Sequence, residues 1–391
     1  MKILYYSAHP GLKMNAATGY GTHMREMIEA FKRKGHEVLP VILGDIKRNI
    51  EVVPESNKLF LKKAIKKIIP NYLWKSLKDY ELIKFDLNAE LILEEKIIAF
   101  NPDLIYERGS YLQLSGVKMA KKFKLKHYIE LNAPFVEESA SFEGAAGFFK
   151  QKALHIEKEQ ILQSEKTIVV SSALQNYYSD KYKVHKSNFL VTPNCINAQG
   201  VLSNIELKQE LITRYHLKDK KIIGFVGSIF PYHGVDLLIE AFSELQPLYA
   251  HLQLLIVGDG AMLPKLKAYA FSMGTNAIFT GSVSHKEIYT YIDIMDIAVM
   301  AKSNWYGSPV KIFEYGAMGK TIIAPDTKPV RDVMEDGVDG FLVKPAVKDL
   351  KNAISKIMED AELGIKMGEN FKNKVFANYT WDAIAAKILN E

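Results

Sequence analysis

The sequence predicts an α/β protein that contains two doubly wound parallel sheets. Short apolar runs typical of buried strands alternate with stretches of helical periodicity along most of the 391 residues. The alternation forms two successive series of similar size, and a polar, irregular stretch at 198–220 separates them. Sheets of this kind bind ligands at the carboxyl ends of their strands. The loops that follow the strands are therefore the candidate sites.

The composition is that of an ordinary globular protein, with 48% hydrophobic and 25% charged residues. Cys195 is the single cysteine, which excludes an internal disulfide and a cysteine metal cluster and favours a cytoplasmic location. The N-terminal apolar run is too short for a signal peptide, and we find no run long enough to span a bilayer. The net charge of +6 suits phosphorylated substrates or an anionic membrane, and we expect no nucleic acid partner.

The first series opens with a strand at 2–8, a glycine-rich loop and a helix at 23–34. The loop carries Gly19 and Gly21 in the motif T-G-Y-G, at the carboxyl end of the first strand. We predict a ligand contact there, because glycine lets the backbone approach a ligand closely. An ordinary glycine-rich connection is the alternative.

Lysines and apolar residues interleave over 58–78, and Tyr72 and Trp74 flank them. A basic amphipathic helix with an aromatic flank is typical of an element that lies on an anionic membrane surface. A helix that packs on the sheet with its lysines outward explains the same pattern, and the sequence favours neither reading.

Polar residues follow the later strand in H-Y-I-E-L-N-A-P. Glu130 and Asn132 lie at its end and are candidates for a substrate-binding cleft. The other predicted elements of this series are helices at 82–100, 111–126 and 148–165 and strands at 102–108, 167–172 and 189–197.

The second series begins with the strand K-I-I-G-F-V-G-S and a helix from 235. Further strands are predicted at 252–260, 277–283, 296–300, 321–324 and 337–343. We therefore expect an N-terminal domain at 1–200 and a C-terminal domain at 205–377, with a terminal helix at 378–391 that packs back on the first domain.

The stretch Ser303–Pro325 combines turn formers with a helix that has Val310, Phe313 and Ala317 on one face. Its first turn carries Lys311 and Glu314. A helix N-terminus and a lysine favour an anion, and a carboxylate suits hydroxyl groups. Phosphate next to a polyol is the chemistry of a nucleotide-sugar. A solvated Lys–Glu pair after the helix-start residue Pro309 is the alternative.

The order of motifs in the second series resembles that of family 4 glycosyltransferases with the GT-B fold, the glycosyltransferase group 1 type. The motifs are G-S-I-F-P-Y-H-G-V-D-L-L-I-E-A-F from Gly227, V-G-D-G, F-T-G-S-V, S-P-V-K-I-F-E-Y-G-A-M-G-K-T-I-I-A-P and G-V-D-G-F-L-V. V-T-P-N-C-I-N, T-G-Y-G and E-L-N-A-P are also of the family's kind. Each motif is weak alone, and the ordered set is specific.

The resemblance implies two Rossmann-like domains facing each other across a cleft, an acceptor-side domain at 1–200 and a nucleotide-sugar-binding domain at 205–377. It also implies a retaining sugar transfer from a nucleotide-diphosphate donor, without a metal or a further cofactor. Glu314 would accept hydrogen bonds from the ribose, Lys311 would neutralise the diphosphate, and main-chain groups near Ser282 would meet the base. The implied catalytic residues are Lys311, His233, Glu130 and Asn132. The implied donor-binding residues are Gly19, Gly21, Gly227, Ser228, Gly258, Ser282, Val283, Gly307, Ser308, Pro309, Val310 and Glu314.

Three positions depart from the family pattern. Ser228 and His233 stand where the family often has arginine and lysine. Tyr306 stands eight positions before Glu314, where the family has a first glutamate. The histidine that many members carry after the fourth strand is absent, so we expect Glu130 or Asn132 in its role.

We therefore expect a hexosyltransferase at the inner face of the cytoplasmic membrane, with a lipid-linked or cell-surface glycan as acceptor. A nucleotide-sugar-binding partner subunit with little activity and a nucleotide-sugar epimerase of the same fold are the alternatives.

Overall fold

The computed structural model describes residues 1–16, 18–46 and 69–390, and these form two units. The first unit contains residues 1–170, 174–192 and those from Ala385 onward. The second contains residues 171–173 and 193–384. The boundary after Thr192 precedes the predicted division near 200, and the residues from Ala385 onward cluster with the first unit.

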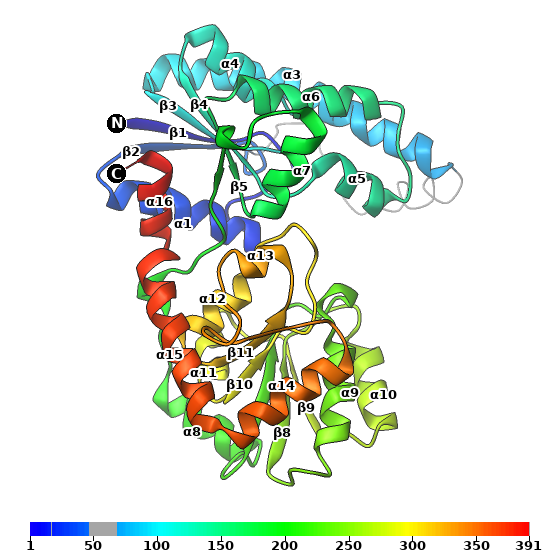
Figure 1. The fold of residues 1–391 in the computed structure, drawn as a ribbon. Helices are drawn as coiled ribbons and strands as arrows, with labels where there is room; N and C mark the ends of the chain where they lie inside the picture. Colours follow the sequence, from blue (N-terminus) through cyan, green and yellow to red (C-terminus); the bar gives the residue numbers. More distant parts are fainter. Residues whose placement is uncertain (17, 47–68, 391) are drawn as a thin grey trace. The chain divides into compact units, whose positions relative to one another are not determined.

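A parallel six-stranded sheet in the order β2-β1-β3-β4-β5-β6 forms the centre of the first unit. Helices cover both of its faces (Figure 1). The strands are β1 (Lys2–Ser7), β2 (Glu37–Ile42), β3 (Leu104–Arg108), β4 (Lys126–Leu131), β5 (Lys166–Val169) and β6 (Phe189–Val191). The helices are α1 (Gly19–Arg33), α3 (Asn71–Phe100), α4 (Ser115–Phe123), α5 (Phe135–Glu143), α6 (Lys150–Gln163), α7 (Ser172–Tyr182) and α16 (Trp381–Leu389), the last reaching this unit from Ala385.

The second unit repeats this architecture with the strand order β12-β11-β10-β7-β8-β9. Apolar clusters on the two faces of its sheet form its core. The strands are β7 (Lys221–Val226), β8 (Leu252–Val257), β9 (Ala277–Gly281), β10 (Ile297–Val299), β11 (Thr321–Pro325) and β12 (Phe341–Val343). The helices are α8 (Ile205–Arg214), α9 (Val235–Leu245), α10 (Leu263–Ser272), α11 (Ile288–Asp293), α12 (Val310–Ala317), α13 (Lys328–Arg331), α14 (Val347–Glu359) and α15 (Ala361–Asn378).

The predicted α/β class with two doubly wound sheets is confirmed, but the stretch 198–220 is not irregular throughout. It contains α8, which Asn204 caps by accepting a hydrogen bond from the N–H of Leu207 at 2.9 Å. Leu211 is fully buried on this helix. Leu207 and Ile212 of this helix also pack against the core, but the charged residues between these apolar positions concealed the helix in the sequence.

The stretch 58–78 lies partly outside the described residues. In its described part, Lys75 is not a surface lysine, because it is buried and its ammonium ion-pairs with Asp79 and contacts the Tyr111 hydroxyl at 3.0 Å. Tyr111 is 36 positions away, so only the fold reveals this contact. Whether 58–78 binds a membrane stays a prediction.

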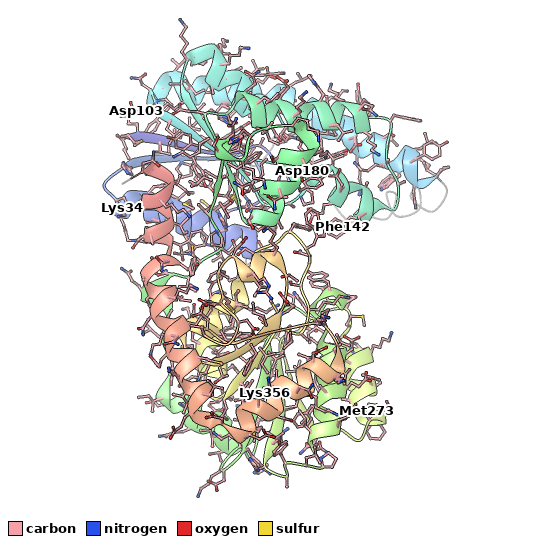
Figure 2. The ribbon with its side chains drawn as sticks, viewed as in Figure 1. Lys34, Asp103, Phe142, Asp180, Met273 and Lys356 are labelled. Atoms are coloured by element: carbon pink, nitrogen blue, oxygen red, sulfur yellow. The ribbon has the colours of Figure 1, made fainter. Side chains whose placement is uncertain are left out.

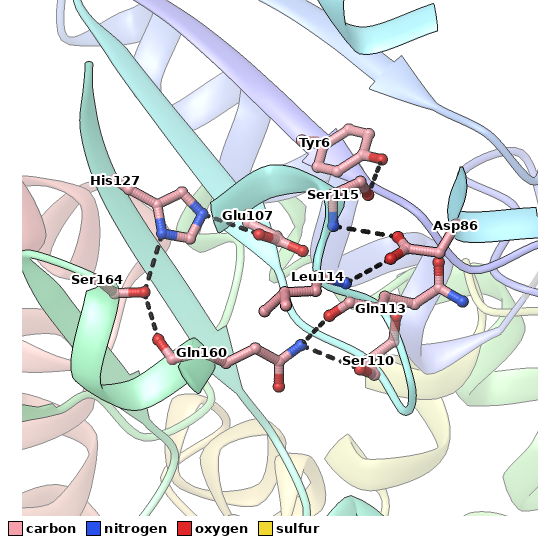
Figure 3. A network of polar contacts seen from close by, with 10 residues as sticks. All are labelled: Tyr6, Asp86, Glu107, Ser110, Gln113, Leu114, Ser115, His127, Gln160 and Ser164. Carbon is pink, nitrogen blue, oxygen red and sulfur yellow. Dashed lines mark hydrogen bonds and ion pairs between the residues drawn. The ribbon is translucent and has the colours of Figure 1, made fainter. Parts of the chain in front are cut away.

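Polar side chains tie the helices of the first unit to its sheet (Figure 3). Asp86 of α3 accepts hydrogen bonds from the N–H groups of Leu114 and Ser115 and so caps α4. His127 of β4 lies between Glu107 of β3, at 2.8 Å, and Ser164, at 2.9 Å. Because these groups are buried and bonded to one another, we interpret the network as structural.

Candidate functional site

The second unit has a topological switch point between β7 and β10. These strands are neighbours, but the chain leaves β7 towards β8 and β9 and returns to β10 on the other side. The loop after β7 (227–234) and the connection after β10 (300–309) therefore flank one point at the carboxyl edge of the sheet. This is where a doubly wound sheet binds its ligand.

Glycines bring the loops of this edge into close contact. Gly227 has φ +138°, and a Cβ there would lie 3.0 Å from Cε of Lys311. A Cβ at Gly258 would lie 2.0 Å from the carbonyl oxygen of Gly227. Both N–H groups are already bonded, that of Gly227 to the carbonyl of Val257 at 2.9 Å and that of Gly258 to the carbonyl of Gly281 at 3.0 Å. These glycines thus allow close approach and do not offer N–H donors.

Lys311 lies in the first turn of α12, with its ammonium 4.8 Å from the centroid of the Phe225 ring. Among the described residues, no group hydrogen-bonds or ion-pairs with it. Burial lowers the pKa of Lys311 to about 8, although Glu314 opposes this effect. A half-buried cation with no anionic partner at hydrogen-bond distance is ready to receive one from a ligand.

Glu314 lies one turn further along α12 and is half-buried. Within the described ranges, its carboxylate has no hydrogen-bond donor. Burial raises the pKa of Glu314, and the charges of His285 and Lys311 oppose the increase. A carboxylate without a donor fits the predicted ribose contact. Sequence reasoning missed His285, although it follows Val283 by two positions, because an exposed histidine in a polar loop carries no pattern.

His233 ends a 3-10 turn over Pro231–His233 beside Lys311. Its Nδ1 lies 2.5 Å from the carbonyl oxygen of Ser228, so Nδ1 carries the proton and donates. Burial and the Lys311 charge lower the pKa of His233 to about 4, while the Ser228 carbonyl opposes this. The imidazole is therefore neutral at pH 7, and its Nε2 is an acceptor. It donates to a phosphate only after taking up a proton.

The connection before α12 uses several of its polar groups internally. The N–H of Gly307, which we expected to face the sugar and diphosphate, donates to Oδ1 of Asn304 at 2.6 Å. Ser308 is buried, and its Oγ accepts from the N–H of Asn194 at 3.0 Å. The first-turn N–H groups that follow Pro309 lack i−4 carbonyls within the helix, so they are the donors that remain.

Three further predicted residues, and Tyr306, lie at the same edge. Val310 was placed on the apolar face of α12 but is 42% exposed, because it begins the helix before the buried face starts. Ser282 is exposed and Val283 is half-buried just after β9. Tyr306 is half-buried, and its ring contacts that of Trp305 at 5.3 Å. The predicted roles of Val310, Ser282 and Val283 in donor binding stay predictions.

In the first unit, Glu130 is the acceptor at the centre of a polar cluster at the end of β4. Its carboxylate receives hydrogen bonds from Tyr106 (2.7 Å), Arg108 (2.9 Å), Asn132 (2.6 Å) and Nε2 of His23 (3.1 Å). Burial alone would raise the pKa of Glu130, but His23, Arg108 and Tyr106 hold it well below its usual range.

This cluster changes which side chain of the first unit is available to a ligand. Glu130 is 2% exposed and satisfied by protein donors, whereas the His23 side chain is 12% exposed. Sequence reasoning missed His23 and Arg108, because the pairing joins residues 107 and 22 positions apart. The charged end of the strand P-D-L-I-Y-E-R was the available signal.

Gly19 and Gly21 do not lie in a loop but in the first turn of α1, which Thr18 caps. The hydroxyl of Thr18 accepts from the N–H of Gly21 at 3.3 Å. A Cβ at Gly21 would lie 2.4 Å from the carbonyl oxygen of Ala16, whereas one at Gly19 would meet open space. Packing therefore explains Gly21, and Gly19 is the residue at which a ligand can approach.

Two features are absent from the described residues. No helix among them is long and apolar enough to cross a membrane. No three of their His, Cys, Asp or Glu side chains are grouped so as to hold a metal ion.

Two family models match the chain, one in each half. "Glycosyltransferase Family 4" matches residues 17–199, and "Glycosyl transferases group 1" matches residues 208–374. The second match contains the site at the switch point between β7 and β10.

Relatives and solved structures agree with these matches. An uncharacterized glycosyltransferase of Methanocaldococcus jannaschii is 24% identical over 387 residues, which is 96% of this chain and 93% of the relative. A lipopolysaccharide 1,2-N-acetylglucosaminetransferase of Salmonella typhimurium is 25% identical over 235 residues, 57% of this chain and 60% of the relative. HepE of Anabaena, solved with UDP and glucose, superposes with a TM-score of 0.72 at 17% identity and covers 100% of this chain and 98% of HepE. The chain belongs to the group 1 glycosyltransferases with the GT-B fold.

Proposed function

We propose that this glycosyltransferase moves a hexose-type sugar from a UDP- or GDP-sugar to a lipid-linked or cell-surface glycan, with retention at the anomeric carbon and without a metal. The observation that carries the proposal is the pair Lys311 and Glu314, one cation and one carboxylate about one turn apart on α12 with no described hydrogen-bond partner. A diphosphate next to a ribose supplies a partner to each of them.

In this proposal, Lys311 and the first-turn N–H groups of α12 hold the diphosphate, and Glu314 accepts from the ribose hydroxyls. The bond between the anomeric carbon and the phosphate oxygen breaks as the acceptor oxygen attacks from the same face. The departing phosphate oxygen takes the acceptor proton, so no separate base is required. Removing one such prepositioned donor costs about 3 kcal/mol, or roughly a hundredfold or more in rate.

The proposed donor and acceptor classes are supported by the ligands and names of similar proteins. HepE was solved with UDP and glucose, and the Salmonella relative is named for transfer to lipopolysaccharide. We propose a peripheral position on the inner face of the cytoplasmic membrane, where lipid-linked acceptors are found.

A thermal-shift titration with UDP- and GDP-sugars tests the donor site. We expect one of these sugars to stabilise the wild type, and Glu314→Ala to bind it about tenfold or more weakly, because a charge-assisted hydrogen bond contributes about 1.5–3 kcal/mol. Glu314→Gln keeps an acceptor and should retain part of the affinity.

Glu359→Ala, at the exposed end of α14 in the same unit, is the matched control and should bind like the wild type. The donor site is wrong if no nucleotide-sugar stabilises the wild type, or if Glu314→Ala binds as well as the control. Binding without any transfer or hydrolysis by the purified chain would instead identify a binding subunit.

A further inference from the structure

The first unit displays a group of exposed aromatic and aliphatic side chains at the start of α3 and in the connection between α5 and α6. Phe142 is 82% exposed and Phe148 is 69% exposed. Figure 2 labels Phe142 at the C-terminal end of α5. We call this group the aromatic patch; it consists of Tyr72, Leu77, Tyr80, Phe142 and Phe148.

Contacts with α3 hold the connection in place. The N–H of Phe148 donates to Oγ of Ser76 at 2.9 Å, and the Phe148 ring meets that of Tyr72 at 5.7 Å. A Cβ at Gly147 would lie 3.0 Å from both Cγ of Lys75 and Oγ of Ser76. The rings of the patch therefore project from a fixed backbone, although exposing two phenylalanines to water is unfavourable.

Basic side chains surround the patch. Lys78 lies over the Trp74 ring at 5.7 Å, and Lys84 lies over the Tyr80 ring at 4.7 Å. Lys150 and Lys152 are exposed at the start of α6. Glu81 is an exposed acid of α3, and Asp79 is buried against Lys75. Lys78, Lys84, Lys150 and Lys152 thus lie on the same segments as the patch.

Aromatic rings surrounded by lysines match the boundary of an anionic bilayer. Rings lie at the level of the headgroups and the first acyl carbons, and ammonium groups lie among the lipid phosphates. We propose that the aromatic patch docks on an anionic lipid bilayer, with Phe142 and Phe148 inserted and the four lysines at the phosphate layer. This inference rests on the proposed function, because a lipid-linked acceptor lies in such a bilayer.

Vesicle co-sedimentation tests the docking. Wild type should bind vesicles of mixed phosphatidylglycerol and phosphatidylcholine, and should bind pure phosphatidylcholine much more weakly. The double variant Phe142→Ser/Phe148→Ser should lose about tenfold in partitioning per ring. Lys150→Gln/Lys152→Gln should partition about thirtyfold more weakly than the wild type, on anionic vesicles only.

Phe271→Ser is the matched control, because Phe271 is 88% exposed on α10 of the second unit. It should partition like the wild type. Failure of the wild type to bind anionic vesicles, or equal binding by the double variant and the control, overturns the proposal.

Other occupants of the patch give different results. A double variant with a markedly lower Tm would show that the chain itself covers the patch. A wild-type dimer that the double variant converts to a monomer would assign the patch to a second copy. Either result overturns the proposal.

Nucleotide-sugar binding by the same proteins separates this inference from the proposed function. The double variant should retain the thermal shift of the wild type. If the wild type binds vesicles but shows no thermal shift with any nucleotide-sugar, the docking proposal stands and the proposed donor site is wrong.

Discussion

At the residue scale, His233 differs in charge from the arginine or lysine of the family pattern, because its imidazole is neutral at pH 7. Its Nδ1–H is committed to the carbonyl of Ser228, and its neighbour Lys311 is itself a cation. The pKa of about 4 leaves it neutral in the unliganded protein at pH 7. A diphosphate next to Nε2 favours the protonated form and must raise this pKa. Binding then takes up a proton.

The affinity for UDP-glucose should therefore increase as the pH falls from 7 towards 5. By linkage, uptake of a full proton corresponds to at most about tenfold per pH unit. UDP-glucose is the probe because its diphosphate does not titrate in this range. Calorimetry in buffers of different ionisation enthalpy measures the proton uptake directly.

His233→Asn is the informative variant, because its amide can keep the bond to Ser228 but does not titrate. It should abolish the increase below pH 7. It should keep the loss of affinity above pH 8 that follows from the pKa of about 8 at Lys311. Identical pH profiles for the variant and the wild type would remove His233 from the donor site.

At the element scale, the loop after β7 determines where Lys311 lies. Gly227 has a backbone conformation that other residues rarely adopt, and a Cβ there would lie 3.0 Å from Cε and 3.3 Å from Nζ of Lys311. Gly227→Ala should therefore destabilise the protein by about 1–3 kcal/mol. It should also displace Lys311 and weaken UDP-glucose binding.

Gly274→Ala separates the two effects. Gly274 also has a positive φ, of +63°, but a Cβ there meets nothing within 4 Å. This variant should lose stability and keep the affinity for UDP-glucose, as measured by chemical unfolding and calorimetry. Equal affinity in both variants would show that the loop does not position Lys311 for the proposed donor binding.

At the scale of the whole molecule, the chain returns to its first unit at its C-terminal end. Ala385 and Ile388 are fully buried, and Lys166 donates to the carbonyl of Ile388 at 2.6 Å. Ile388→Ala should cost about 2–5 kcal/mol, because it leaves a cavity in a packed core. We expect this loss in the first unit.

Hydrogen exchange followed by mass spectrometry checks this expectation unit by unit. Protection should fall in β5 and β6 of the first unit, whereas UDP-glucose binding and protection in β7 and β8 should not change. Ile365→Ala, a change at a 65% exposed position of α15, should have little effect. Equal loss of protection in both units would mean that they unfold as one.

The sequence predicted the strands of both units well, because a strand of a parallel sheet is buried on both faces and reads as a continuous apolar run. Residues 222–226 show this in β7. The start of α1 was harder to predict from the sequence, because its first turn contains two glycines and depends on the Thr18 cap. The sequence also proposed Lys311 and Glu314 from their place at a helix start, which is a local feature.

What the sequence by itself determined is the α/β class, the order of the motifs and hence the family, since these follow from local periodicity and spacing. Only the tertiary structure decided which polar side chains have partners. Glu130 is satisfied by donors from β3, from α1 and from Asn132 just after its own strand, whereas Glu314 has no described donor. Both are glutamates near the carboxyl edge of a parallel sheet. They differ because hydrogen-bond partners come from residues that are distant in the chain, and the fold alone brings these together.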